Sequence, residues 1–156
     1  MSGKEVKVLP DVEPAIDFVT FGFSAPPGNL AAAIPPEYIG GERLRIAAYR
    51  KLASLESEAA LEDYRAELVD RFGKIPEITA NLLEVTRLKI LAALAGYRIF
   101  TVVEGRVTLR NPGDTIYRLA NGCAPSVDYR DPPRLRLRQL AEILREAGAK
   151  NAEAAR

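Results

Sequence analysis

Three stretches of the chain repeat apolar residues every three to four positions, a spacing that places them on one face of a helix. The first begins near Glu42, and the third begins at Pro76. The second follows Ser57, and serine is a residue that often caps the start of a helix. Their apolar stripes are Leu44, Ala48, Leu52 and Leu55, then Leu61, Tyr64, Leu68 and Phe72, then Ile78, Leu82, Val85 and Leu88, widened by Leu83, Ile90, Leu91 and Leu94. We expect three helices, the third being the most buried and lying at the centre of the domain.

The second and third helices meet at residues 67–76, which read Glu-Leu-Val-Asp-Arg-Phe-Gly-Lys-Ile-Pro. Gly73 tolerates the positive φ that often ends a helix, and Pro76 has a φ already suited to the first turn of the next one. The stop and the restart are therefore both encoded locally, and we expect the two helices to meet at a fixed angle.

Charged and apolar residues separate cleanly at this joint. Glu67 and Asp70 lie three positions apart, so both carboxylates fall near one face of the second helix. Leu68 and Phe72 lie four apart and face the core together. The joint is expected to present acidic groups outward.

Strand-like patterns flank the three helices. Residues 15–24 alternate in a way that predicts a strand buried in part on both faces, whereas 30–34 is either a second strand or a packed loop. Residues 98–103 and 106–109 are rich in β-branched side chains, and the intervening Glu104-Gly105 suits a two-residue turn. We expect a β-hairpin there.

The last part of the chain is interpreted from weaker signals. After a turn at 111–113, Asp114 is a candidate cap for a short helix through residue 119. Residues 134–138 alternate strictly between arginine and leucine, which predicts a strand, and a final helix is expected over about 139–147. The Ala- and Glu-rich remainder past Gly148 is expected to fray.

These elements predict the α+β class, with a helical hairpin or bundle packed against a small, mainly antiparallel β-sheet. A chain of 156 residues suits one domain. We expect residues 1–14 to form a flexible or vector-derived lead-in, 15–148 a single domain, and 149–156 a frayed tail.

Composition narrows the kind of partner and the compartment. The 22 basic and 21 acidic side chains nearly cancel, so a charged partner must recognise a local patch. The one cysteine, Cys123, cannot form an internal disulfide, and no apolar run approaches the roughly 20 residues of a membrane span. We expect a cytoplasmic protein that does not contact a membrane.

The side chains present exclude the common catalytic sites. The chain has no histidine, and the glycines match neither a phosphate-binding loop nor a dinucleotide fingerprint. Glu67 and Asp70 are the nearest candidates for an acid and base pair, but carboxylates at this spacing are ordinarily a solvated face. We expect no enzyme activity, cofactor or metal, and a loop-filling role for Cys123.

Three arginines of the predicted last strand allow two interpretations. Arg134, Arg136 and Arg138 would share one strand face. As a phosphate-binding strip they would make the chain a nucleic-acid-binding accessory module with salt-sensitive affinity. Alternatively, they are the solvent face of an edge strand, where charge prevents unwanted pairing.

Motifs spread over residues 34–98 resemble the C-terminal domain of bacterial transcription-repair coupling factor. They are Ile-Pro-Pro-Glu-Tyr-Ile at 34–39, Arg-Leu at 43–44, Tyr-Arg-Lys-Leu-Ala at 49–53, Glu-Leu-Val-Asp-Arg-Phe-Gly at 67–73 with Pro76, Asn-Leu-Leu at 81–83, Arg-Leu-Lys at 87–89 and Ala-Leu-Ala-Gly at 93–96. Residues 18–33 are longer and more apolar than the family's usual short strand, and the chain after residue 111 is only generically similar.

The resemblance implies a regulatory module rather than a motor. In the family, the whole protein is an ATP-driven DNA translocase that acts on stalled RNA polymerase and recruits excision repair. Its C-terminal domain docks on the N-terminal UvrB-like module, covers the surface that binds UvrA and so restrains the factor. The acidic pair of the family's docking face corresponds to Glu67 and Asp70, with Arg71 as a further candidate contact. RNA polymerase, UvrA and DNA would then be partners only through the full-length protein.

Overall fold

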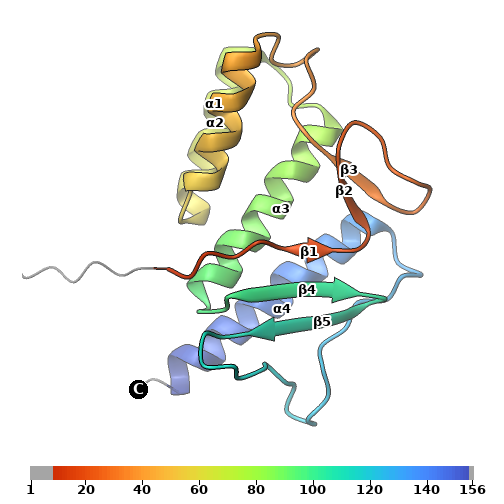
Figure 1. The fold of residues 1–156 in the computed structure, drawn as a ribbon, viewed down its shortest axis with the longest axis vertical. Coiled ribbons are helices and arrows are strands. Elements are labelled where there is room, and N and C mark those ends of the chain that lie inside the picture. Colours follow the sequence, from red (N-terminus) through yellow and green to blue (C-terminus); the bar gives the residue numbers. More distant parts are fainter. Residues whose placement is uncertain (1–8, 155–156) are drawn as a thin grey trace, which may run out of the picture.

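The computed structural model describes residues 9–154 of the chain. Within them, the helices are α1 (Glu42–Ser54), α2 (Glu58–Phe72), α3 (Glu77–Leu94) and α4 (Pro133–Ala154). The strands are β1 (Ala15–Ile16), β2 (Val19–Phe21), β3 (Leu30–Ala32), β4 (Ile99–Val103) and β5 (Arg106–Arg110). Figure 1 shows α1 and α2 on one side of α3, and the strands β1, β4 and β5 beside α4. The predicted α+β class is confirmed.

The strands form two small sheets, and their pairing is mixed. In the first, β1 is parallel to β4, and β4 is antiparallel to β5. In the second, β2 and β3 are parallel. The three-stranded sheet is mainly antiparallel, as predicted, because the antiparallel β4–β5 register runs from Ile99 to Val103, whereas the parallel β1–β4 register covers only Ala15 and Ile16. Strand β1 reaches β4 through the long excursion that contains α1, α2 and α3, a connection that suits parallel pairing.

The single strand predicted over 15–24 is divided between the two sheets. Asp17 leaves the first sheet after its amide donates to the Val102 carbonyl oxygen at 3.1 Å, and Phe18, at 1% exposure, turns into the core. The chain then re-enters extended structure as β2. The segment 30–34, which allowed a strand or a loop, contains the strand β3.

The predicted hairpin is confirmed. Strands β4 and β5 are joined by Glu104 at φ 49° and Gly105 at φ 85°, the pair of positive angles that a tight hairpin turn requires. Gly105 also lies against the backbone, because a Cβ there would be 2.5 Å from the Val127 carbonyl oxygen. Only glycine fits this position without local movement.

Helix α3 lies at the centre of the fold, as the sequence predicted. It carries more buried residues than any other described helix and contributes to both hydrophobic clusters. Near its N-terminus, the Thr79 hydroxyl donates to the Ala33 carbonyl oxygen at 3.0 Å, and the Asn81 amide donates to that of Ala31 at 2.9 Å. These bonds fix β3 on α3.

The predicted strand at 134–138 is wrong, because these residues form the first turns of α4. Pro133 is the first helical residue, a position that suits proline. The apolar residues of this segment recur with the spacing of a helix, and this longer pattern outweighs the short alternation. Those on the buried face of α4 are Leu137, Leu140, Ala141, Leu144 and Ala147. The helix also continues to Ala154, so it ends later than the predicted limit of about 147, while 155–156 lie outside the described residues.

The predicted helix from Asp114 to residue 119 is also wrong. Asp114 has φ 64° and ends a tight turn, in which its amide donates to the Asn111 carbonyl oxygen at 3.0 Å. The turn brings Ile116 beside Arg110 as an isolated bridge, so the chain returns along β5 instead of coiling.

A few apolar residues lie elsewhere than their stripes predicted. Leu44, in the first turn of α1, and Leu94, the last residue of α3, are exposed because each lies at a helix end beyond the core. In the expected lead-in, residues 1–8 lie outside the described residues, whereas Val12 is buried in the core. The domain division itself stays a prediction.

Candidate functional site

The joint between α2 and α3 places its two carboxylates outward. The buried stripe of α2 consists of Leu61, Tyr64 and Leu68, whereas Glu67 and Asp70 are exposed. Phe72, expected in the core, is half-buried at the end of the helix. The structure thus brings Glu67 and Asp70 together on one exposed helical face.

Local and long-range contacts fix the joint. Gly73 has φ 89°, and its amide donates to the Val69 carbonyl oxygen at 2.9 Å, which ends α2. Tyr38, far away in sequence, places its hydroxyl 3.1 Å from the Leu68 carbonyl oxygen and 2.9 Å from that of Gly73. Burial raises the pKa of Tyr38, so the hydroxyl stays a neutral donor at physiological pH. The joint is held from outside α2 as well as within it.

Arg71 folds back along its own helix. Its Nη1 lies 3.4 Å from Glu67 Oε2, and its guanidinium lies 4.9 Å from the centre of the Phe72 ring. Both members of the ion pair are about half exposed, so the pair contributes little stability. Among the described residues, Asp70 has no ion-pair partner within 4 Å.

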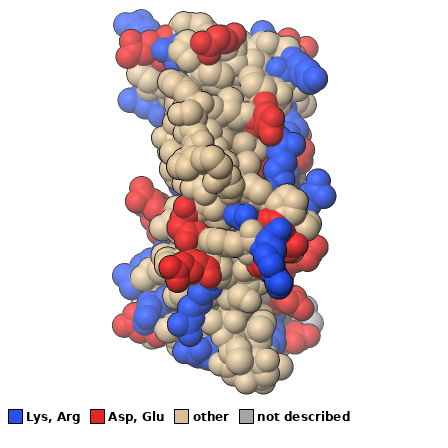
Figure 2. Space-filling model, turned by 90° about the vertical axis from the view of Figure 1, so that its right-hand side faces the viewer, with Lys and Arg blue, Asp and Glu red and all other residues tan. Residues whose placement is uncertain are grey.

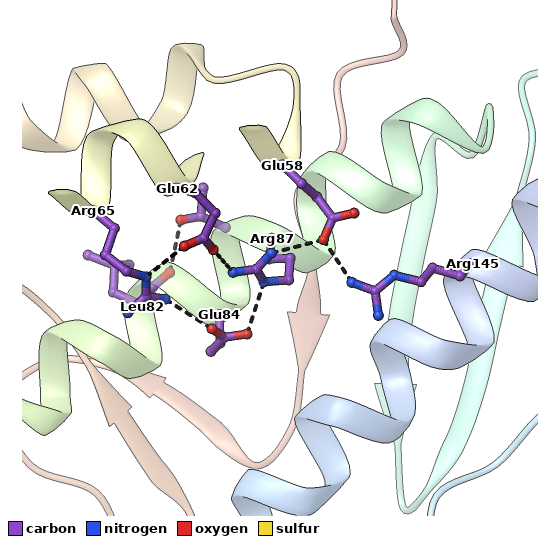
Figure 3. A network of polar contacts seen from close by, with 8 residues as sticks. Glu58, Glu62, Arg65, Leu82, Glu84, Arg87 and Arg145 are labelled. Carbon is purple, nitrogen blue, oxygen red and sulfur yellow. Dashed lines mark hydrogen bonds and ion pairs between the residues drawn. The ribbon is translucent and has the colours of Figure 1, made fainter. Parts of the chain in front are cut away.

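An ion-pair network at the other end of α2, shown in Figure 3, joins it to α3 and α4. Its members are Glu58, Glu62, Arg65, Glu84, Arg87 and Arg145. Arg87 contacts Glu58 at 2.9 Å, Glu84 at 3.2 Å and Glu62, and Arg145 reaches Glu58 at 2.7 Å. Three positive and three negative groups compensate one another, so the network ties three helices together without leaving a charged site.

The pKa directions in this network follow from competing causes. Burial opposes the charged form of Arg87, but hydrogen bonds to Glu62 and Glu58 outweigh it and hold the Arg87 pKa above its usual range. Burial would raise the pKa of Glu58, but hydrogen bonds from Arg87 and Arg145 lower it. Sequence reasoning missed this cluster, because helical spacing reveals only the pairs within one helix.

The three arginines at 134–138 do not share a face. Arg134 and Arg138 are exposed on α4, and Arg134 pairs with Glu77 at 3.2 Å. Arg136 lies on the other side of the helix and is buried. The proposed strip of three arginines therefore does not exist.

Arg136 instead joins three segments inside the protein. Its guanidinium donates to the carbonyl oxygens of Asp131 and Tyr129, both at 2.9 Å, and of Gly28 at 3.4 Å. It lies 4.9 Å from the ring centre of Phe18 and 4.5 Å from that of Tyr129, distances typical of cation–π contacts. Its charge is thus used internally, and Tyr129 in turn donates to the Asp17 carboxylate.

The described residues offer neither a metal site nor a membrane-spanning helix. No group of His, Cys, Asp and Glu suited to hold a metal ion occurs between residues 9 and 154. Cys123 is exposed and free. None of the helices in this part of the chain has the length and hydropathy needed to cross a bilayer.

One face of the molecule carries an uncharged band. It covers the upper half of the face in Figure 2, which is the side toward which the connection between β2 and β3 projects in Figure 1. The sequence explains the band, because Glu37 is the only charged residue between positions 19 and 41. Phe23 and the prolines Pro35 and Pro36 line a hollow there.

Comparison with known proteins identifies the family. The sequence model of the TRCF domain matches residues 29–116, more than half of the chain. The chain belongs to the TRCF domain family. The match spans α1, the α2–α3 joint and the hairpin, so the family's region contains the exposed carboxylates of Glu67 and Asp70.

Relatives of the TRCF domain support the assignment. The transcription-repair-coupling factor of Haemophilus influenzae is 40% identical over 63 residues, or 40% of this chain and 6% of that protein. That of Staphylococcus haemolyticus is 44% identical over 68 residues, or 44% of this chain and 6% of that protein. The matched region thus spans only a small part of these relatives.

A solved structure shows the same fold over nearly the whole chain. A crystal structure of the C-terminal domain of transcription-repair coupling factor superposes with a TM-score of 0.65 at 18% sequence identity. The superposition covers 96% of this chain and 99% of that one. The fold of the TRCF domain therefore extends beyond the matched segment to α4.

Proposed function

We propose that this chain is a regulatory, non-catalytic module of a transcription-repair coupling factor, which docks on the factor's N-terminal UvrB-like module. In the docked state it would mask the surface that binds UvrA and hold the factor in a restrained form. The observation that carries the proposal is the joint: Glu67 and Asp70 are exposed together on a helix whose end is fixed by Gly73 and Tyr38. ATP-driven movement on DNA and contact with RNA polymerase would belong to other parts of the factor.

Two carboxylates on one helical face suit a reversible contact. They can accept charge-assisted and bidentate hydrogen bonds from arginines of a partner. Such pairs set orientation and association rate more than affinity. Because the joint is already fixed, docking requires little further ordering of the helix that carries them.

Arg71 modifies this contact. A partner arginine that approaches Glu67 would exchange with Arg71, and the exposed pair offers little resistance because it contributes little stability. The released Arg71 would remain at the edge of the interface beside Phe72. Arg71 is therefore a further interaction residue in the proposal.

Titration calorimetry with the purified UvrB-like module tests the docking. The double variant Glu67→Lys with Asp70→Lys should weaken binding by at least about tenfold. The affinity of the unmutated chain for the module should also fall more steeply with added salt than the affinity of the variant. A matched control is Glu142→Lys with Glu146→Lys, which changes the charge equally at two exposed carboxylates of α4.

Equal affinities for the unmutated chain and the Glu67 and Asp70 variant would refute the docking role, as would an equal loss in the α4 control. The alternative function, a nucleic-acid-binding accessory module, depended on Arg134, Arg136 and Arg138 sharing one strand face. Since they lie on a helix and Arg136 is buried, no observation favours that function.

A further inference from the structure

An apolar hollow opens where α1 lies beside α3. Its walls include Tyr49 and Leu52 of α1, Val85 and Lys89 of α3, and Phe21 at the end of β2. Phe21 is 62% exposed and Tyr49 is 40% exposed, so aromatic surface continues from the hollow onto the outside of the molecule. Large apolar side chains exposed around a concavity are typical of binding surfaces.

A basic groove follows along the outer side of α1. It is lined by Arg43, Ile46, Arg50 and Lys51, and Ile46 is 44% exposed. Ile46 lies three residues before Tyr49 and four before Arg50, and residues at these spacings are neighbours on a helix surface. The groove and the hollow therefore adjoin at Ile46 and Tyr49, and we call the two together the α1 surface.

The α1 surface carries uncompensated positive charge. Between residues 9 and 154, no carboxylate lies within ion-pair distance of Arg43, Arg50, Lys51 or Lys89. No Asp or Glu lines either the hollow or the groove, and Glu42 lies outside both, in the first turn of α1. The arginines of the ion-pair network, by contrast, are neutralised within the fold.

We propose that the α1 surface docks an acidic, amphipathic segment of a partner protein. An aliphatic or aromatic side chain of that segment fills the hollow beside Phe21, and flanking carboxylates meet Arg50 and Lys89. Arg43 and Lys51 are eight residues apart, about 12 Å along a helix, so the contact spans about two helical turns of the partner. Docking of an amphipathic helix into an apolar groove follows the same principle.

The apolar content favours a protein over a nucleic acid. A phosphate backbone would use the cations but leave Phe21 and Ile46 in contact with water. A base placed in the hollow would leave its polar edge unpaired against Leu52 and Val85, which costs free energy. An aliphatic side chain has no polar edge to satisfy.

The α1 surface differs from the proposed docking site on α2 in position and in sign of charge. Glu67 and Asp70 require a basic partner, whereas Arg50 and Lys89 require an acidic one. The two contacts can therefore be removed separately, and neither depends on the other.

Selection from a phage-displayed library of random peptides tests the inference with the complete chain. Peptides that bind the unmutated chain should be enriched in Asp and Glu placed beside Leu, Ile or Phe. Their affinity, measured by fluorescence anisotropy, should fall by at least about tenfold for Arg50→Glu with Lys89→Glu. Phe21→Ala should weaken binding without changing its salt dependence, because it removes apolar contact only.

The control variant is Arg118→Glu, an exposed arginine outside the α1 surface, and circular dichroism checks that each variant is folded. Selected peptides without acidic residues, peptides that bind the Arg50 and Lys89 variant equally well, or an absence of any enriched peptide would each overturn the inference. A fluorescent duplex DNA that binds the same surface more tightly than the peptides would overturn the assignment to a protein partner.

Discussion

Replacing Arg87 by methionine should measurably destabilise the protein. The Arg87 side chain is 15% exposed, and between residues 9 and 154 it is the only cation that contacts Glu58, Glu62 and Glu84 together. Methionine has a similar length but no charge, so the substitution leaves three carboxylates close together without their common partner. The repulsion and the lost hydrogen bonds both act on the folded state.

The magnitude follows from the exposure of the partners. Removing one partner of a fully buried ion pair costs about 3–5 kcal/mol. The carboxylates here are between 34% and 49% exposed, so water screens part of the repulsion, and we expect a loss of about 2 kcal/mol. For a protein of this size, that corresponds to a fall of about 4–8 °C in the melting temperature.

Equilibrium unfolding in urea, followed by circular dichroism, measures this loss. The control Arg145→Met removes one half-exposed contact with Glu58 and should cost at most about 0.5 kcal/mol. The dependence on pH provides a second readout. The lowered pKa of Glu58 contributes stability above its ordinary value of 4.5, and this contribution is lost as the pH falls through the folded-state pKa.

The stabilities of the unmutated chain and of Arg87→Met should therefore converge as the pH falls below the ordinary carboxyl range. If Arg87→Met were as stable as Arg145→Met at neutral pH, the network would not stabilise the fold as described. A constant difference between the two proteins down to acid pH would show that packing rather than charge causes the loss.

Two further predictions concern the hairpin and its surroundings. Gly105→Ala should lower the free energy of unfolding by at least about 2 kcal/mol, because the positive φ is strained for alanine and the added Cβ would meet the Val127 carbonyl oxygen. The control Gly22→Ala has free space around it and should cost little. Equal urea midpoints for the two variants would contradict this. Burial and the hydrogen bond to Asp17 raise the pKa of Tyr129 to about 12, so its contribution to stability is complete below pH 10 and is lost as the pH rises through 12. Absorbance at alkaline pH should show Tyr129 losing its proton near pH 12 in the unmutated chain and at lower pH in Asp17→Asn. The same titration in both proteins would show that Asp17 does not raise the Tyr129 pKa.

The elements that could be predicted from the sequence are those with local signals. Ser57 caps α2 by accepting a hydrogen bond from the Ala60 amide, and Gly73 ends the helix with a positive φ. Glu104 and Gly105 form the expected turn. Ser57, Gly73 and Gly105 are residue types that favour these conformations, so the elements could be predicted without knowledge of distant contacts.

The errors arose where two patterns overlapped or where a distant contact decided. The alternation at 134–138 resembles a strand, but Leu137 also begins the helical stripe of α4, and the longer pattern prevails. The strand predicted at 15–24 is divided because Asp17 bonds to residues more than 80 positions later in the chain: its amide donates to the Val102 carbonyl oxygen, and its carboxylate accepts from the Glu104 amide. Phe18 then turns into the core. No local signal contains that information.

The candidate site was predictable to the same extent. The outward position of Glu67 and Asp70 followed from helical spacing, because neither falls on the buried stripe that includes Leu61 and Leu68. The hydroxyl of Tyr38, which fixes the joint from 30 residues away along the chain, could not be foreseen. Nor could the α1 surface, because a lack of ion pairs becomes visible only when the neighbours of each cation are known.

The contacts at the two ends of α2 have different consequences for the proposed docking. Arg87 and Arg145 hold the first turn of α2 through Glu58, whereas Tyr38 holds its last turn beside Glu67 and Asp70. Glu58 and Asp70 are twelve residues apart, about 18 Å along the helix, so loss of the Arg87 and Arg145 contacts with Glu58 acts far from Asp70. The network therefore governs how firmly α2 is anchored, and the Tyr38 contact governs the local angle at which the carboxylates are presented. Because a charge-assisted contact depends on the geometry of the paired groups, the docking affinity should follow the Tyr38 contact more closely than the global stability.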